Sequence, residues 1–342
     1  GAVLAALSRA LGREAHVLTQ RPDLLWQQLY NDLSPLKVSD LTTLLEQEAD
    51  RRRSTHWLKR RGGAAAVAMR VLASLASGIE SCDWSYSTGL LGIGCRDGTV
   101  QLLDSKLIDP LLLGRHEGPV SCCRFSIDGS LLITGSKDST LSVFKVADRK
   151  RYGVFKGHKS PVTCLAVLPD GKHAVSGSQD RSLIIWDIET LEIVKTLRGH
   201  DRGVLCCTVS ADGSRLASGD TGGRLVLWNL HTFEPLRSFT AHDDAVLCCA
   251  LNRGGDILLS GAADETARIW HLNEAQPPVE LAGHTDEVAG CGFAGDDQIV
   301  TVSADQSIRS WNLATGASTA VSHGRGGAIT CLSMQSDGRI AY

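Results

Sequence analysis

The sequence has no long apolar run and no secretory leader. Its longest apolar stretch, AAAVAMRVLASLASGI at 64–79, contains Arg70 and is too short for a helix that crosses a bilayer. Neither sign of charge is in excess, because 35 Lys and Arg stand against 38 Asp and Glu. This balance does not indicate a nucleic acid or a membrane surface as partner. With no targeting segment and with thiols that need not pair, we expect a cytoplasmic protein.

Two chemical motifs are also missing. There is no GxxxxGK[ST] phosphate loop, so this chain should not bind a nucleotide. No CxxC pair with an accompanying ligand cluster occurs, so we expect neither a metal nor another cofactor. Proline is scarce, at 9 residues against 35 glycines, which indicates many tight turns. Because the chain starts at Gly1 rather than at Met, we expect it to be a fragment of a longer protein.

What the sequence does have is a repeat. Histidines at 116, 158, 200, 242 and 284 are each 42 residues apart, and another follows 39 residues later at 323. An Asp lies 22 residues after His116, His158 and His242, at 138, 180 and 264, and 21 residues after His284, at 305. An aromatic residue follows each of these Asp residues after six positions: Phe144, Trp186, Trp270 and Trp311. A fixed period of this length indicates an architecture of stacked units.

Each unit contains four short strand patterns separated by turn signals. In the unit from His158 these patterns are PVTCLAVL, HAVSGS, SLIIWDI and IVKTLRG. With the Gly-His and Trp-Asp marks, the sequence resembles the WD-repeat β-propeller family over about 79–342. The resemblance implies an all-β propeller of about seven four-stranded blades, the last one incomplete. First strands are expected near 79, 120, 162, 204, 246, 288 and 328, and the strand that closes the ring is expected at 68–77 in a connector at 62–78.

The resemblance also implies hydrogen-bonded tetrads of His, Ser or Thr, Asp and Trp within single blades. Complete sets occur in three blades: His158, Ser176, Asp180, Trp186; His242, Ser260, Asp264, Trp270; and His284, Thr301, Asp305, Trp311. The blade from His116 has Thr134 and Asp138 but ends in Phe144. In the blade from His200, Gly222 stands where the Asp is expected, and the first blade keeps Asp97 but lacks His and Trp.

These residue types would also suit a catalytic triad. Because the set recurs at the blade period and an enzyme needs one nucleophile, we favour a structural role and expect no enzyme. The cysteines follow the same period, at 122, 164, 206 and 248, with Cys331 in the corresponding place. A ring of metal-binding or redox thiols is one interpretation, and small apolar residues in a crowded place are the one we favour.

The segment 1–61 has a different pattern. Apolar residues at helical spacing predict three helices, in VLAALSRALGREAHVL, RPDLLWQQLYNDL and SDLTTLLEQEAD, followed by the basic stretch RRRSTHWLKRR at 51–61. This stretch is either a nucleic-acid or import patch or, as we favour, a solvated helix end. Residues 10–61 resemble the helical linker of signal-transduction ATPases, in which a NACHT- or NB-ARC-type module precedes WD repeats. The resemblance implies an ATPase module upstream of Gly1.

We therefore expect a non-catalytic scaffold that binds other proteins, as the WD-repeat part of a larger signalling ATPase. Partner contacts are expected at turns on one face, through Asp201, Asp243, Asp244, Asp286, Glu287, Arg96, Arg115, Lys137 and Lys159. The acidic members indicate a basic protein segment as ligand, although ordinary solvated turn residues would have the same composition. The alternatives are a stand-alone WD-repeat adaptor, for instance of a ubiquitin ligase or a trafficking assembly, an enzyme that uses the central channel, and a nucleic-acid binder through 51–61.

Overall fold

The computed structural model of the chain describes residues 77–85, 87–104, 110–274, 276–295, 297–323, 329, 331–334 and 340–341. The chain divides into two compact units, Gly1–Arg70 and Val71–Tyr342, and all described residues belong to the second. The helices predicted within 1–61, the basic stretch at 51–61 and nearly all of the connector at 62–78 lie outside the described residues. In the described part of the chain, no helix has the length and apolar character needed to span a membrane.

Six four-stranded antiparallel sheets follow one another along the chain, each with its strands in sequence order. The first sheet contains β1 (Ile79–Trp84), β2 (Leu90–Cys95), β3 (Thr99–Asp104) and β4 (Leu111–Arg115). The second contains β5 (Val120–Phe125), β6 (Leu131–Ser136), β7 (Thr140–Lys145) and β8 (Lys150–Lys156). The third contains β9 (Val162–Val167), β10 (His173–Ser178), β11 (Ser182–Asp187) and β12 (Ile193–Arg198).

The remaining sheets repeat this plan. The fourth contains β13 (Val204–Val209), β14 (Arg215–Asp220), β15 (Arg224–Asn229) and β16 (Glu234–Thr240). The fifth contains β17 (Val246–Leu251), β18 (Ile257–Ala262), β19 (Ala267–His271) and β20 (Val279–Leu281). The sixth contains β21 (Val288–Phe293), β22 (Gln298–Ser303), β23 (Ser307–Asn312) and β24 (Ser318–His323). Two short strands, β25 (Ser333–Met334) and β26 (Ile340–Ala341), form a separate sheet.

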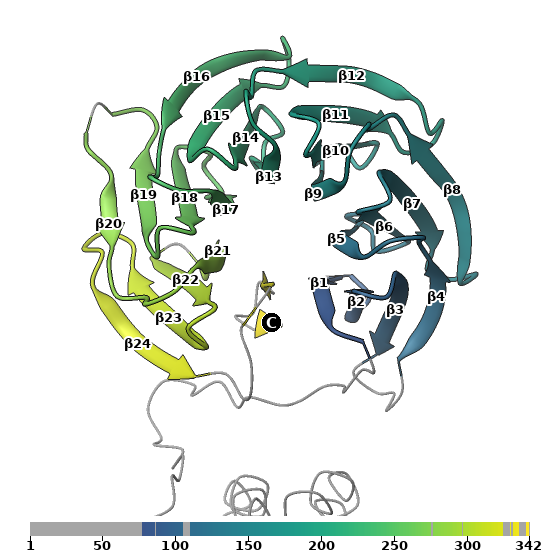
Figure 1. Ribbon diagram of the computed structural model, residues 1–342, viewed down its shortest axis with the longest axis horizontal. Coiled ribbons are helices and arrows are strands. Elements are labelled where there is room, and N and C mark those ends of the chain that lie inside the picture. The colour runs from purple at the N-terminus through teal and green to yellow at the C-terminus, as the bar shows by residue number, and fades with distance from the viewer. Residues whose placement is uncertain are drawn as a thin grey trace, which may run out of the picture. The chain divides into compact units, whose positions relative to one another are not determined.

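The six sheets fan around a central axis, with the first strand of each sheet innermost (Figure 1). Neighbouring innermost strands contact one another in the order β1, β5, β9, β13, β17 and β21, and β1 also contacts β25. The predicted all-β class and the predicted four-stranded units are therefore confirmed for six units. The seventh shows two short strands among the described residues.

The hydrophobic core lies between the sheets and not within any one of them. One cluster joins Val175, Leu183 and Ile185 of the third sheet to Val204 and Trp228 of the fourth. The second and third strands of a sheet are buried almost throughout, whereas the outermost strands β12 and β16 are mostly exposed. A single sheet has two apolar faces that only its neighbours can cover, so burial requires the repeat.

Close approach between sheets depends on a glycine near the end of the second strand. A Cβ atom at Gly177 would lie 2.5 Å from Cys164 Sγ and 2.8 Å from Val204 Cγ1 of the next sheet. Gly219 stands in the same relation to Val246, with a distance of 2.7 Å. A glycine at this position thus lets the first residue of the following innermost strand pack directly on the preceding sheet.

Candidate functional site

A chain of polar side chains runs through the third sheet. The Trp186 indole donates to Ser176 Oγ at 2.8 Å, and Ser176 Oγ lies 2.8 Å from His158 Nε2. His158 Nδ1 lies 2.9 Å from Asp180 Oδ2. Trp186 opposes Ala174 in the strand pair, so Ser176 is its diagonal neighbour on the same face. This hydrogen-bonded network therefore joins the turn before β9, strands β10 and β11, and the turn between them.

The same geometry recurs in the fifth and sixth sheets. His242 joins Asp264 Oδ2 at 2.9 Å and Ser260 Oγ at 2.8 Å, and Trp270 donates to Ser260 at 2.9 Å. In the sixth sheet His284 contacts Asp305 at 2.9 Å and Thr301 at 2.8 Å, and Trp311 donates to Thr301 at 2.8 Å. The structure thus brings together the members of all three sets that the sequence singles out.

The fourth sheet corrects one expectation. Its His200 is not left without a carboxylate, because Asp220 Oδ2 lies 2.7 Å from His200 Nδ1. Asp220 stands at the end of β14, where the third sheet has Ser178, two residues before the Gly222 that the repeat spacing singles out. The other oxygen of Asp220 accepts hydrogen bonds from the backbone amides of Gly222 and Arg224. A carboxylate placed two residues earlier therefore serves both the histidine and the turn.

The second sheet lacks only the indole. His116 bonds Asp138 at 3.0 Å and Thr134 at 2.9 Å, and the fully buried Phe144 occupies the aromatic position. Thr134 is left to donate to the carbonyl of Ser142 at 3.4 Å or to the histidine. In the first sheet Asp97 accepts from the amide and hydroxyl of Thr99.

The electrostatics of these networks favour a neutral histidine and an ionised aspartate. Burial lowers the pKa of His158, although Asp180 opposes the shift. Burial alone would raise the pKa of Asp180, but hydrogen bonds from Ser182, the Lys159 amide and His158 lower it to about 2. In this state Trp186 donates to Ser176, Ser176 donates to His158, and His158 donates to Asp180, so that every polar group is satisfied.

A catalytic use of these serines meets a geometric obstacle. Ser176, Ser260 and Thr301 are fully buried, and each already contacts an indole and an imidazole. A hydroxyl nucleophile must be reached by substrate, and these hydroxyl-bearing side chains have no exposed surface. The arrangement therefore links strands to turns.

Comparison with known proteins agrees with this architecture. The family model described as WD domain, G-beta repeat matches residues 111–145, 149–187, 191–229, 233–271 and 275–312, more than half of the chain. The chain belongs to the WD-repeat family. The matched segments are offset from the sheets: 149–187 covers the outermost strand of one blade, β8, and the three inner strands of the next. Each sequence repeat thus joins two blades.

Curated relatives match over short segments. The human angio-associated migratory cell protein is 37% identical over 68 residues, which are 19% of this chain and 16% of that protein. The guanine nucleotide-binding protein subunit beta of Schizosaccharomyces pombe is 36% identical over 81 residues, 23% of this chain and 26% of that protein. The human serine-threonine kinase receptor-associated protein is 46% identical over 41 residues, 12% of each chain. The matches therefore span at most about a quarter of these relatives.

The candidate partner-binding residues of the WD-repeat blades are exposed and lie at turns, apart from Arg115, which ends β4. Because His158 bonds Asp180, the turn before the first strand and the turn before the third strand of a blade lie on the same face. Three candidates are held in local ion pairs on this face. Asp201 pairs with Arg224 at 2.7 Å, and Arg96 and Lys137 both approach Glu80, at 2.6 and 3.8 Å. Arg115 donates to the Asp97 carbonyl at 3.0 Å.

The other candidate residues are exposed and lie in turns that precede innermost strands. Asp243, Asp244, Asp286 and Glu287 occupy the turns before β17 and β21, and Lys159 occupies the turn before β9. Asp244 and Asp286 each accept one backbone hydrogen bond, from Ala245 and Glu287. Among the described residues, none of the four carboxylates forms an ion pair. We define these four residues as the acidic turn group.

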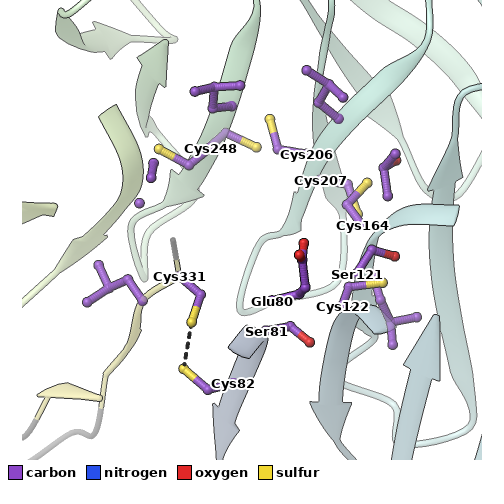
Figure 2. A pocket seen from close by; sticks show the side chains of 18 of the residues that line it. Glu80, Ser81, Cys82, Ser121, Cys122, Cys164, Cys206, Cys207, Cys248 and Cys331 are labelled. Atoms are coloured by element: carbon purple, nitrogen blue, oxygen red, sulfur yellow. Dashed lines mark hydrogen bonds between the residues drawn. The ribbon is translucent and has the colours of Figure 1, made fainter. Parts of the chain in front are cut away.

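Most of the cysteines line the axis of the propeller. A cavity of about 170 Å³ is bounded by residues of the innermost strands, including Cys82, Cys122, Cys164, Cys206 and Cys248 (Figure 2). Cys331 also lines it, but lies two residues before β25 and not within a strand. Burial raises the pKa of Cys122 to about 12. Within the described residues, no group of three or more His, Cys, Asp or Glu side chains could hold a metal ion.

Several of these thiols take the place of a hydroxyl. Ser81 Oγ donates to the Val120 carbonyl of the next blade at 3.1 Å, and Cys206 Sγ and Cys248 Sγ lie 3.6 Å from the carbonyls of Val246 and Val288. The sequence pattern alone does not reveal these contacts between blades, because they depend on how neighbouring sheets meet. They give the cysteines a packing and hydrogen-bonding role, in line with the interpretation as small residues in a crowded place.

Proposed function

We propose that this chain is a non-catalytic scaffold that binds other proteins through the turn face of its WD-repeat blades. The single observation that carries the proposal is that the polar side chains of the blades fall into two groups, one buried and one exposed. The His, Ser and Asp residues of the repeats are buried and bonded to one another, as in His158, Ser176 and Asp180. The polar groups left for a ligand are those at the exposed turns.

The acidic turn group is the part of that face best suited to a partner. Asp243, Asp244, Asp286 and Glu287 come from two neighbouring blades and are exposed. The ion pairs of Asp201, Arg96 and Lys137 already satisfy those side chains, so we assign them a smaller part than the sequence alone would give. Complementary charge steers association and selects the partner. A basic protein segment is therefore the ligand that we propose.

A partner experiment tests this assignment. In the full-length protein, Asp243→Asn, Asp244→Asn and Asp286→Asn are combined. The matched control combines Glu189→Gln, Glu192→Gln and Glu234→Gln, which are exposed residues in or beside turns at the opposite end of the blades. We expect the acidic-turn variant, but not the control, to lose its co-purifying proteins by quantitative mass spectrometry. Equal recovery from both variants would overturn the assignment.

We further propose that the propeller is the WD-repeat sensor of a larger NACHT- or NB-ARC-type signalling ATPase, which it would hold inactive until a partner binds. The resemblance of residues 10–61 to the helical linker of that class supports this proposal. The full-length reading frame tests it. We expect a GxxxxGK[ST] motif upstream of Gly1. A reading frame that begins close to Gly1 without such a motif would instead favour a stand-alone WD-repeat adaptor.

A further inference from the structure

Two thiols meet where the first sheet adjoins the β25 segment. Cys331 Sγ lies 3.3 Å from Cys82 Sγ, across 249 positions of sequence. Cys82 belongs to β1, and Figure 2 shows the two side chains pointing toward one another at the wall of the channel. Cys82 is buried and Cys331 is partly exposed.

Further contacts hold the two segments in register. Ser333 Oγ accepts a hydrogen bond from the Trp84 amide at 3.1 Å and lies 3.3 Å from Asp83 Oδ1. The residues that follow the two cysteines are therefore hydrogen-bonded to one another. Two thiols held in contact lose little further freedom when they are joined, so their reaction with each other is favoured over reaction with other thiols.

Other thiol neighbours in the channel are oriented differently. Cys206 and Cys249 adjoin one another, and the presence of Cys249 raises the pKa of Cys206. However, Cys206 Sγ lies 3.6 Å from the Val246 carbonyl oxygen and Cys249 Sγ lies 3.9 Å from the Ala217 carbonyl oxygen. Each of these two sulfurs also lies near a backbone carbonyl of a neighbouring strand, whereas the thiol of Cys331 donates to the sulfur of Cys82. The Cys206–Cys249 pair is thus an internal control.

We propose that Cys82 and Cys331 are a site of oxidative modification, at which a peroxide converts the two thiols into a disulfide between blades. The Cys331 thiolate attacks one oxygen of hydrogen peroxide, which gives a sulfenic acid and, after protonation, one water. The Cys82 sulfur then attacks the Cys331 sulfur and displaces a second water. In sum, two thiols and one peroxide give one disulfide and two waters.

The channel determines both access and rate. Both cysteines line the cavity of about 170 Å³, which is large enough for a peroxide. The neighbouring Cys331 thiol and burial raise the pKa of Cys82 well above its ordinary value. Since the thiolate is the reactive form, the second step, in which Cys82 attacks the Cys331 sulfur, is slow at neutral pH and speeds up as the pH rises.

The disulfide would have a structural consequence. It would close a covalent loop across the 249 positions between the two cysteines and tie the β25 segment to β1. A cross-link restricts the unfolded chain most when the loop is long. Oxidation therefore stabilises the junction between the first sheet and the β25 segment, independently of which protein the turn face binds.

The test is peptide mapping of the oxidised chain. The 342-residue chain is treated with hydrogen peroxide at neutral and at mildly alkaline pH, then digested without reduction. We expect a linked peptide pair containing Cys82 and Cys331, two hydrogen atoms lighter than the separate peptides, formed faster at the higher pH. Hydrogen exchange at 79–84 and 331–334 should slow after oxidation.

Variants and controls distinguish the outcomes. Cys331→Ser should abolish the linked pair, whereas Cys206→Ser should leave its yield unchanged. Peptide mapping of the wild-type chain tests the proposed disulfide even if a variant fails to fold. A disulfide that maps to Cys206 and Cys249 in equal yield, or oxidation that stops at sulfenic or sulfinic acid on Cys331, would overturn the proposal.

Discussion

At the scale of single residues, the carboxylate that bonds the histidine of a blade can come from more than one position in the sequence. Asp180 reaches His158 from the turn after β10, and Asp220 reaches His200 from the end of β14 itself. Both aspartates also accept hydrogen bonds from the amides of the following turn. The blade therefore needs a carboxylate between histidine and turn, and the chain supplies it from either of two positions.

Replacing Asp220 tests this equivalence. In Asp220→Ala, His200 and two turn amides lose their acceptor, so we expect a loss of about 1–3 kcal/mol in the free energy of unfolding. Asp243→Ala, at an exposed aspartate without an ion pair among the described residues, is the control and should change that free energy by less than about 0.5 kcal/mol. Urea unfolding followed by tryptophan fluorescence measures both. Equal stability of the two variants would contradict the role of Asp220.

Acid should weaken the fold through the same networks. Because the pKa of His158 is below its ordinary 6.5 in the folded state, the unfolded chain binds more protons below that pH, and stability falls as pH falls. The pKa of Asp180 is about 2 against an ordinary 3.8. Its contribution is therefore complete above about pH 4 and is lost toward pH 2.

The measurement is the urea midpoint as a function of pH. We expect a continuous decrease from neutral pH to about pH 3, with a smaller decrease below about pH 4 in Asp180→Asn. An amide at this position cannot titrate and so removes that part of the dependence. A midpoint that does not change with pH would show that the histidines and aspartates are not buried as described.

The sequence predicts the members of the complete networks because spacing and residue type recur together. It does not predict Asp220, because a search at 22 residues beyond the histidine finds Gly222. The signal was present in the sequence, as an Asp in place of the Ser that ends the second strand of three other blades. Only the folded strand shows that this side chain reaches the imidazole.

At the scale of strands and sheets, turn chemistry sets the boundaries. The strands predicted for the unit from His158 correspond to β9, β10, β11 and β12. In the turn between β10 and β11, Asp180 accepts from the amide and hydroxyl of Ser182, and Arg181 adopts a φ of 69°. Because such turns leave a local mark in the sequence, the strand limits could be predicted without knowledge of the ring.

Packing between sheets gives a prediction at Gly177. A methyl group there would meet Cys164 Sγ at 2.5 Å and Val204 Cγ1 at 2.8 Å. We expect Gly177→Ala to cost about 1–3 kcal/mol of stability through overpacking. Gly78→Ala is the control, since its Cβ would meet only the flexible Arg96 side chain at 3.9 Å. Chemical denaturation of both variants measures this difference. A Gly177→Ala protein as stable as the control would contradict the close approach between Gly177 and the next sheet.

At the scale of the whole propeller, stability is unevenly distributed across each blade. The innermost and central strands are covered by neighbouring sheets, whereas β12 and β16 are largely exposed. We expect amide hydrogens on the outer edges of β12 and β16 to exchange faster than those of β10 and β14. Hydrogen exchange with mass spectrometry measures this gradient. Uniform protection across a blade would contradict the arrangement.

Contacts that depend on the ring as a whole could not be predicted from the sequence. Cys82 and Cys331 meet although 249 positions separate them, and no local pattern relates them. The same holds for the donation from Ser81 to Val120 between adjacent sheets. Periodicity predicts what each blade contains, but the contacts between blades follow from the angle at which the sheets pack.

The central claim is that the repeated His, Ser, Asp and Trp residues stabilise each blade internally and that the exposed carboxylates do not. The most direct test is the free energy of unfolding of Asp180→Ala beside that of Asp243→Ala. We predict a loss of about 1–3 kcal/mol for Asp180→Ala and less than about 0.5 kcal/mol for Asp243→Ala. An Asp180→Ala protein that unfolds at the same urea concentration as the wild type would contradict the claim.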